Sequence, residues 1–264
     1  MIAVCALQSG AQTLTATYVE LADSADRYIR SERWADAERV IVKALRHEPA
    51  NKSNYLLWSN LGMVRHEQRN YEGAVMAYDI GLASAPRSTS LLSNRARTYL
   101  ALGKRGEARA DIEQALSLDS ALQWPRKMRG ILRSAEGDTV GAMRDFRIYL
   151  DRYPEDAAVD EAMGDIAARG GDIDRALELY SKAYKLEPDE EIIGKKLLTA
   201  YSYGRFDAMR KDLADAMKKY PRSGQLYLIR ALYHKAMYQT EAMEQDIELA
   251  RKFGVEQQTI DSFF

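Results

Sequence analysis

The stretch WSNLGMVRHEQRNYEGAVMAYDIGLASAP, from Trp58 to Pro86, decides the fold of this chain. It holds two apolar segments, each containing a small residue, and it ends at a proline. Apolar side chains at helical spacing predict two helices, and a proline cannot continue the second one. Small side chains let two helices of a pair approach closely. The residues that carry this pattern are Trp58, Leu61, Gly62, Ala74, Tyr78 and Pro86.

The same pattern returns along almost the whole chain, at intervals of about 34 residues. Prolines close successive helical runs, and Ser120 stands where one proline is skipped. A small residue also recurs early in each second helix. The prolines are Pro49, Pro86, Pro154, Pro188 and Pro221, and the alanines are Ala37, Ala74, Ala108, Ala142, Ala176 and Ala208.

These recurrent small residues and prolines resemble the tetratricopeptide repeat, a helix–turn–helix unit of about 34 residues. The resemblance implies an all-α, right-handed superhelical solenoid of about seven helix pairs. Residues 14–254 are expected to form this solenoid and residues 255–264 a short C-terminal capping segment, while residues 1–13 would be a signal-peptide remnant or a disordered N-terminus. The pairs are expected at 14–50, 51–86, 87–120, 121–154, 155–188, 189–221 and 222–254, with boundaries uncertain by about 2–4 residues.

Packing positions can be assigned within each pair. Small residues of the first helices should face large residues of the second helices. Glycines between the two helices should supply the positive φ of a tight turn. The small residues are Ala25, Gly62, Ala96, Gly130, Gly164 and Ala231; the large ones are Ile41, Tyr78, Ile112, Phe146, Tyr180 and Leu213; the turn glycines are Gly103, Gly137, Gly171 and Gly204.

A basic residue precedes the small residue of a first helix only where an aspartate precedes the large residue of the second helix. This correlation predicts a salt bridge within each of four repeats, with a structural role because both members belong to helix–helix packing. The predicted pairs are Arg95 with Asp111, Arg129 with Asp145, Lys196 with Asp212, and Arg230 with Asp246.

The composition and motifs argue against several classes of function. The formal net charge is −1, so no broad basic surface for nucleic acid is expected. Cys5 is the only cysteine, which excludes an intrachain disulfide and a multi-cysteine zinc site. No run of apolar residues is long enough to span a membrane. No HExxH, phosphate-binding GxxxxGK[ST] or G-x-S-x-G motif occurs. We therefore expect no catalytic residues, no metal and no cofactor.

Binding of another protein is the favoured function. In the family that the chain resembles, first helices line a concave groove that holds a partner segment. Asparagine can clamp a peptide backbone because its amide both donates and accepts. Trp124 either offers an apolar platform or packs against the neighbouring repeat. The resemblance places on the inner surface Asn60, Met63, Ser93, Asn94, Arg97, Trp124, Lys127, Met128, Ile131 and Asp165.

Two other functions stay open at this stage. One is an envelope-associated subunit of a machine for glycan or lipid uptake or assembly. The other, less favoured, is an enzyme whose polar groups converge through the fold alone. The identity of the partner and the oligomeric state do not follow from the pattern, because a fold fixes a groove and not its ligand.

The N-terminus favours export. Residues 2–7 are apolar, and Ser9, Gly10 and Ala11 follow as small residues, which resembles the end of a secretory signal. This predicts a periplasmic or envelope-associated protein. The alternative is a cytoplasmic protein in which these residues belong to a frayed first helix.

We expect the native mature chain to begin at Gln12, because a signal peptidase cuts after small residues such as Ala11. N-terminal sequencing of protein isolated from its host tests this. An intact Met1 in a cytosolic fraction would contradict export.

Overall fold

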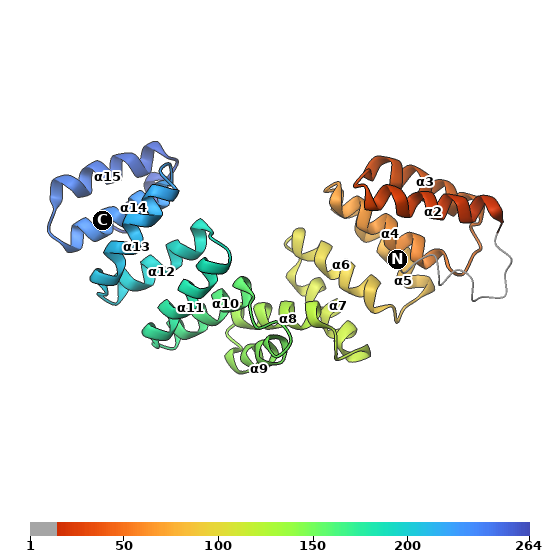
Figure 1. Ribbon diagram of the computed structural model, residues 1–264, viewed down its shortest axis with the longest axis horizontal. Helices are drawn as coiled ribbons and strands as arrows, with labels where there is room; N and C mark the ends of the chain where they lie inside the picture. Colours follow the sequence, from red (N-terminus) through yellow and green to blue (C-terminus); the bar gives the residue numbers. More distant parts are fainter. Residues whose placement is uncertain (1–14) are drawn as a thin grey trace. The chain divides into compact units, whose positions relative to one another are not determined.

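The computed structural model describes residues 15–264, and the regular structure in this part of the chain is entirely α-helical. Fifteen helices, α2 to α16, follow one another there with no strand (Figure 1). The predicted cleavage site after Ala11 lies outside the described residues. The all-α fold of consecutive helix pairs is therefore confirmed.

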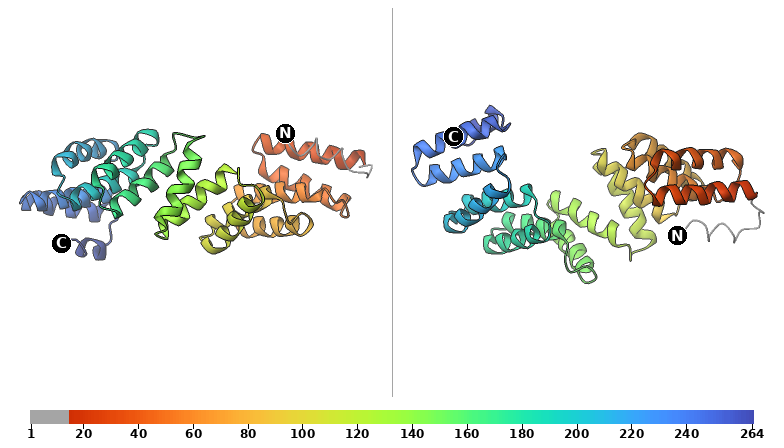
Figure 2. Two further views of the ribbon diagram at one scale, coloured as in Figure 1. Left: turned by 90° about the horizontal axis from the view of Figure 1, so that it is seen from below. Right: turned by 45° about the horizontal axis from the view of Figure 1, so that its top comes forward.

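Contacts divide the chain into two compact units, residues 1–132 and 133–264, with the division inside α8. Figures 1 and 2 show successive helices lying side by side as antiparallel hairpins within each unit. The N-terminal unit contains α2 (Ala16–Arg30), α3 (Trp34–His47), α4 (Asn54–Glu67), α5 (Tyr71–Ser84), α6 (Thr89–Ala101), α7 (Arg105–Leu118) and most of α8 (Gln123–Ala135). The C-terminal unit continues with α9 (Thr139–Leu150), α10 (Ala157–Arg169), α11 (Ile173–Leu186), α12 (Glu190–Ser202), α13 (Phe206–Lys219), α14 (Gly224–Ala236), α15 (Thr240–Lys252) and α16 (Gln257–Asp261).

Side-chain caps fix the start of many helices. Asn70 accepts a hydrogen bond from the backbone N–H of Gly73 and so caps α5, and Ser88 caps α6 in the same way. An oxygen at this position satisfies one of the N–H groups that the first helical turn leaves without a partner. Asp138, Asp156, Asp172, Asp189 and Ser223 cap helices of the C-terminal unit.

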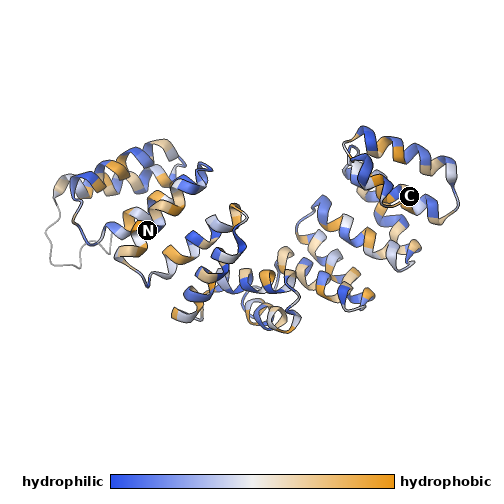
Figure 3. Cartoon of the chain, turned by 180° about the vertical axis from the view of Figure 1, so that it is seen from behind, coloured by the Kyte–Doolittle hydropathy of each residue, from blue (hydrophilic) through white to orange (hydrophobic). Residues whose placement is uncertain are grey.

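Each unit is held by a series of small apolar clusters. One cluster joins α2, α3 and α4, and others follow between later helices. Figure 3 accordingly shows apolar residues in helices all along each unit. Such a series is what a repeat array requires, because each helix pair buries its apolar side against its neighbours.

Within a pair, the size of the small residue matches the size of the residue that it faces. A Cβ added to Gly62 would lie 2.4 Å from the Tyr78 ring, and one added to Gly164 would lie 2.8 Å from the Tyr180 ring. Glycine is therefore needed where the opposing side chain is aromatic. In the first and third repeats the small residues are Ala25 and Ala96, and their clusters contain Ile41 and Ile112 as the large residues.

Each turn between paired helices contains one residue in the left-handed backbone conformation, with a positive φ. Gly103, Gly137, Gly171 and Gly204 have φ of 71°, 86°, 80° and 67°, which confirms the predicted turns. In the other three pairs the same conformation falls on Glu32, Arg69 and Tyr238. The turn geometry is therefore set by the helix pair, and glycine only adopts it at lower energy.

Three of the predicted salt bridges are confirmed. Arg95 donates to both Asp111 oxygens at 2.8 and 2.7 Å, and Arg230 donates to Asp246 at 2.7 and 2.6 Å. Lys196 contacts Asp212 at 2.5 Å. The fourth aspartate, Asp145, accepts from Arg133 at 2.9 Å, and its predicted pairing with Arg129 stays a prediction. Asp111 and Asp246 are almost fully buried, so removing one arginine would leave a buried charge.

One detail of the sequence-based assignment is corrected. Ala208 is exposed, and Met209 is the fully buried residue of α13. The sixth pair has Leu197, also fully buried, at the small position of its first helix, so this pair is packed by two larger side chains. Asn54 begins α4, and its side chain accepts from the Tyr18 hydroxyl at 2.8 Å.

The C-terminal segment lies against the last pair. Ile260 of α16 is buried with Leu228 and Ala250. The Lys235 ammonium donates to the backbone oxygen of Phe263 at 2.9 Å and lies 4.9 Å from the centroid of the Phe264 ring. This short helix covers apolar surface of α14 that a following repeat would otherwise bury.

We expect Gly62→Ala to destabilise the chain by about 1–3 kcal/mol, because the new methyl overlaps the Tyr78 ring. Tyr78→Ile alone should also destabilise, by leaving a cavity. The double variant recreates the alanine–isoleucine combination of the first and third repeats. It should therefore be more stable than the sum of the two single changes predicts.

Chemical denaturation of the three variants measures this coupling. Gly106→Ala is the control, since a Cβ there meets nothing within 4 Å. Additive effects of Gly62→Ala and Tyr78→Ile would show that the two positions do not compensate each other.

Candidate partner-binding site

A shallow hollow of about 330 Å³ lies between the first turns of α6 and α8, in the N-terminal unit. Both are first helices of their pairs, as the sequence-based placement of the groove requires. Four of the predicted groove residues line it, namely Ser93, Asn94, Arg97 and Trp124. Thr89, Ser90, Leu122, Gln123 and Pro125 complete the lining.

The Arg97 guanidinium lies over the Trp124 indole, 4.9 Å from the ring centroid. Arg97 is exposed, and no carboxylate within residues 15–264 forms a salt bridge with it. Stacking on an indole holds the planar guanidinium in one orientation and leaves its N–H groups available at the edge. The arrangement places an unneutralised cation beside an aromatic surface.

The polar groups below Arg97 are partly used within α6. The Ser93 hydroxyl donates to the backbone oxygen of Thr89 at 2.7 Å, and the Thr98 hydroxyl donates to that of Asn94 at 3.0 Å. The Asn94 side chain is half-buried at the edge of the hollow. Its amide can therefore donate to or accept from a bound backbone.

His66 joins α4 to this region. Its Nδ1 lies 3.0 Å from the Thr98 hydroxyl. That hydroxyl also lies 3.0 Å from the backbone oxygen of Asn94, so it links the imidazole to the backbone of α6. Burial lowers the pKa of His66; the nearby Glu67 charge opposes this shift and the Arg97 charge adds to it. The imidazole is therefore neutral near pH 7.

The remaining predicted residues do not line this hollow. Met63 packs against the apolar cluster of α2, α3 and α4. Met128 packs against the cluster of Ala96 and Ile112, and so does Trp124, whose ring serves both packing and the hollow. Three half-buried residues stand on first helices beyond the lining: Asn60 on α4, and Lys127 and Ile131 on α8.

Sequence reasoning missed the residues at the helix starts. Thr89 and Ser90 open α6, and Gln123 opens α8 next to Leu122 and Pro125. They were missed because the repeat pattern marks helix centres, where small and large residues alternate. Pro125 was a usable signal, since a proline in a first helical turn locates the helix start.

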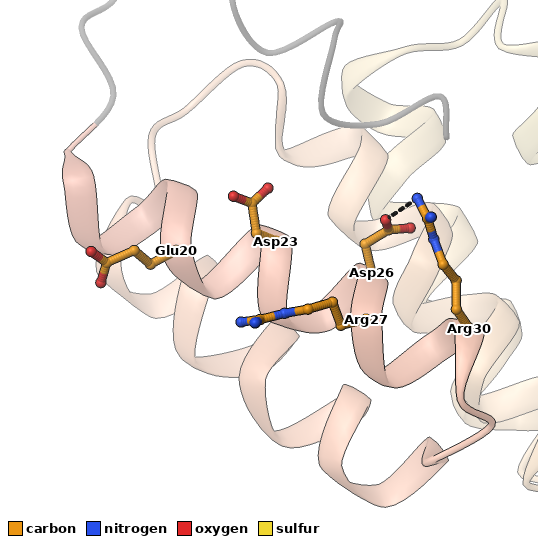
Figure 4. A pocket seen from close by; sticks show the side chains of 5 residues that line it. All are labelled: Glu20, Asp23, Asp26, Arg27 and Arg30. Atoms are coloured by element: carbon orange, nitrogen blue, oxygen red, sulfur yellow. Dashed lines mark hydrogen bonds and ion pairs between the residues drawn. The ribbon is translucent and has the colours of Figure 1, made fainter.

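A second hollow, of about 390 Å³, lies along α2 and is lined by charged side chains of that helix alone (Figure 4). Asp26 and Arg30 pair at 2.5 Å, and Arg27 donates to Ser24. Flexible side chains of one helix give no fixed floor for a ligand. The remaining residues that line this second hollow are Glu20 and Asp23.

Charges on α10 and α12 of the C-terminal unit neutralise one another. Lys195 lies 2.5 Å from Glu161 and 3.1 Å from Asp165, and the Tyr180 hydroxyl donates to Asp165 at 2.7 Å. Burial lowers the pKa of Lys195, but hydrogen bonding to Glu161 and the charge of Asp165 outweigh it, so the pKa is raised overall. Asp165, placed on the inner surface by the resemblance, is thus already occupied by groups of its own unit.

Neither a metal site nor a membrane span is found among the described residues. No group of three or more His, Cys, Asp or Glu side chains in residues 15–264 could hold a metal ion. None of the described helices is both long and apolar enough to cross a bilayer.

Comparison with known families identifies the class of protein. A tetratricopeptide repeat model matches residues 23–89 and 127–191, and a second tetratricopeptide repeat model matches residues 89–122. The chain therefore belongs to the tetratricopeptide repeat family. Proteins of this family generally act as protein-interaction scaffolds, and the fold is typically non-catalytic.

Individual relatives are distant. A serine/threonine-protein phosphatase T of Aspergillus oryzae is 27% identical over 199 residues, which cover 73% of this chain and 40% of that protein. The chain spans 31% to 40% of the length of the curated relatives that it matches.

Solved structures share the fold. A tetratricopeptide repeat protein from Parabacteroides merdae has a TM-score of 0.71 at 22% identity, with 94% of this chain and 98% of that chain covered. PilW, a type IV pilus biogenesis factor, has a TM-score of 0.67 at 18% identity, with 81% and 98% covered. At this identity the likeness shows the fold alone.

His66 should make stability depend on pH. Because its pKa in the folded chain lies below the unfolded value of about 6.5, its neutral form stabilises the fold above that pH. This contribution is lost as the pH falls through the folded pKa. The wild-type chain should therefore lose more stability between pH 7.5 and 5 than His66→Gln does. Equal losses in thermal melts would contradict this.

Proposed function

We propose that this chain is a non-catalytic scaffold that binds an extended segment of a partner protein across α4, α6 and α8. The observation that carries the proposal is the hollow in which Ser93, Asn94, Arg97 and Trp124 come together. An extended segment offers unpaired backbone groups, and side-chain amides on neighbouring first helices can hydrogen-bond to them without reading its sequence.

The chemistry of this face supports binding over catalysis. Its polar groups are an amide, a guanidinium and hydroxyls, and the Nδ1 of the nearby His66 lies 3.0 Å from the Thr98 hydroxyl. A nucleophile beside a base, which covalent catalysis requires, is not assembled in this hollow. The apolar surfaces of Trp124, Leu122 and Pro125 suit side chains of a bound segment.

Export to an envelope compartment is part of the proposal. It rests on the Ser9-Gly10-Ala11 run behind an apolar stretch. The partner should then be found in the same compartment, so affinity purification should start from an envelope fraction as well as from the cytosol.

We expect the double variant Asn60→Ala, Asn94→Ala to bind the partner more weakly by about 1–3 kcal/mol, if each amide makes one or two hydrogen bonds. Its thermal stability should be nearly unchanged, because partly exposed groove residues contribute little to packing. The partner is first identified by co-purification from the native host and mass spectrometry. Calorimetric titration then compares the variant with wild type.

Met76→Ser is the matched control, since Met76 is 62% exposed on α5, a second helix. Unchanged affinity of the asparagine variant would remove both amides from the site. A large loss of stability would instead assign them to packing and would contradict the proposed face.

A further inference from the structure

We propose that the hollow between α6 and α8 recognises the side-chain carboxylate of an aspartate or glutamate inside the partner segment, with Arg97 as the residue that binds it. This inference rests on the proposed function, because it names the chemistry of the segment that the same site takes. It adds a contact to a particular side chain, whereas the asparagine amides can hydrogen-bond to the backbone of any peptide.

Arg97 differs from Arg65, Arg95 and Arg230, three other arginines of first helices, in having no acidic partner within residues 15–264. Arg65 pairs with Glu38 at 2.8 Å, Arg95 with Asp79 and Asp111, and Arg230 with Asp246. Arg97 instead lies on an indole ring, and within the described residues it forms no salt bridge. Five N–H donors on an exposed, permanently charged group are thus free for a ligand.

The stacking also favours one ligand geometry. With one face on Trp124, the guanidinium offers its edge, where two parallel N–H groups match the two oxygens of a carboxylate. Asn94 lies three residues earlier on α6, nearly one turn away, and lines the same hollow. Its amide can donate a further hydrogen bond to the same anion or to the adjoining backbone.

The rest of the lining indicates what stands next to the acidic residue. Leu122, Trp124 and Pro125 form the α8 side of the hollow. Apolar walls reduce the screening of the ion pair by water and provide contact for an apolar side chain. The segment should therefore carry an apolar residue beside its aspartate or glutamate.

An internal side chain fits better than a chain terminus. The hollow lies over α6 and α8, while Asn60 stands on α4 and Ile131 stands further along α8. A segment held across these three helices passes through the hollow and continues on both sides. The carboxylate at the hollow is then in the interior of the segment.

In the C-terminal unit, the position equivalent to Arg97 already takes part in an ion pair within the chain. Asp165 follows Arg97 by about two repeat periods. There a carboxylate occupies the position, and Lys195 neutralises it at 3.1 Å. An anionic segment finds no unmatched cation at that position, so the available site is the one at Arg97.

The probe is a phage-displayed library of random twelve-residue peptides, each followed by the coat protein so that no free C-terminus is presented. Selection on the full chain should enrich Asp or Glu next to an apolar residue. Enriched peptides are then synthesised with acetylated and amidated ends, and their affinity is measured by calorimetry.

Arg97→Gln should weaken binding roughly tenfold or more, as expected for loss of a bidentate charged pair. Changing the acidic residue of the peptide to its amide should weaken binding to the same extent. The two changes together should cost little more than either alone, which shows that the two groups contact each other. Binding to wild type should also weaken as salt is raised, because the pair is partly exposed.

Arg87→Gln is the matched control, an exposed arginine in the turn before α6 that does not line the hollow. It should bind as wild type does, and thermal melts should show all variants folded. Arg97→Lys should not restore affinity, since an ammonium cannot form the fork.

The outcomes separate the two proposals. If peptides lose affinity with the Asn60→Ala, Asn94→Ala variant but not with Arg97→Gln, the scaffold function stands and carboxylate recognition is overturned. If a free C-terminus is needed for binding, the internal position is wrong. If no peptide is enriched, or binding ignores both variants, the proposed function fails together with this inference.

Discussion

The structure depends on the close approach of two helices at one point in each pair. At Gly62 there is no room for a methyl group, because the Tyr78 ring fills the space where it would lie. Where alanine takes the glycine position, as at Ala96, isoleucine takes the place of the aromatic ring. In these two pairs the combined volume of the two facing side chains is therefore similar, as close packing of protein interiors requires, whereas the sixth pair holds two larger side chains. This contact therefore sets the spacing of the two helices in the pair.

Much of this could be predicted from sequence because the signals are local and repeated. Pro86 and Gly103 mark ends of helices, and their recurrence at one period removes the ambiguity that a single motif leaves. The pairing of Arg95 with Asp111 was also accessible, since basic and acidic residues occurred in the same repeats. The burial of Met209 could not be predicted. The repeat pattern requires a small residue early in the second helix, and the neighbouring Ala208 fits that pattern, but the buried space in α13 holds the larger Met209 side chain.

The candidate site was predicted less completely, for a physical reason. A groove position follows from helix register, so Asn94 and Arg97 could be placed on a face. Whether neighbouring side chains then meet depends on rotamers, and the sequence carries no repeated signal for those. The stacking of Arg97 on Trp124 and the contact between His66 and Thr98 are visible only in the structure. For the same reason Asp165 was placed on the inner face without its neutralising partner.

The division of the apolar interior into small clusters has a consequence for how the molecule can change. A cluster such as that of Ala96, Ile112, Leu116 and Leu132 involves only neighbouring helices, so a disturbance there is not transmitted to a common core. The residues that set this packing also differ from most of those that line the hollow. Substitutions can therefore accumulate on the surface of one stretch while the remaining helices keep their stability. In such an array the surface can diverge faster than the architecture.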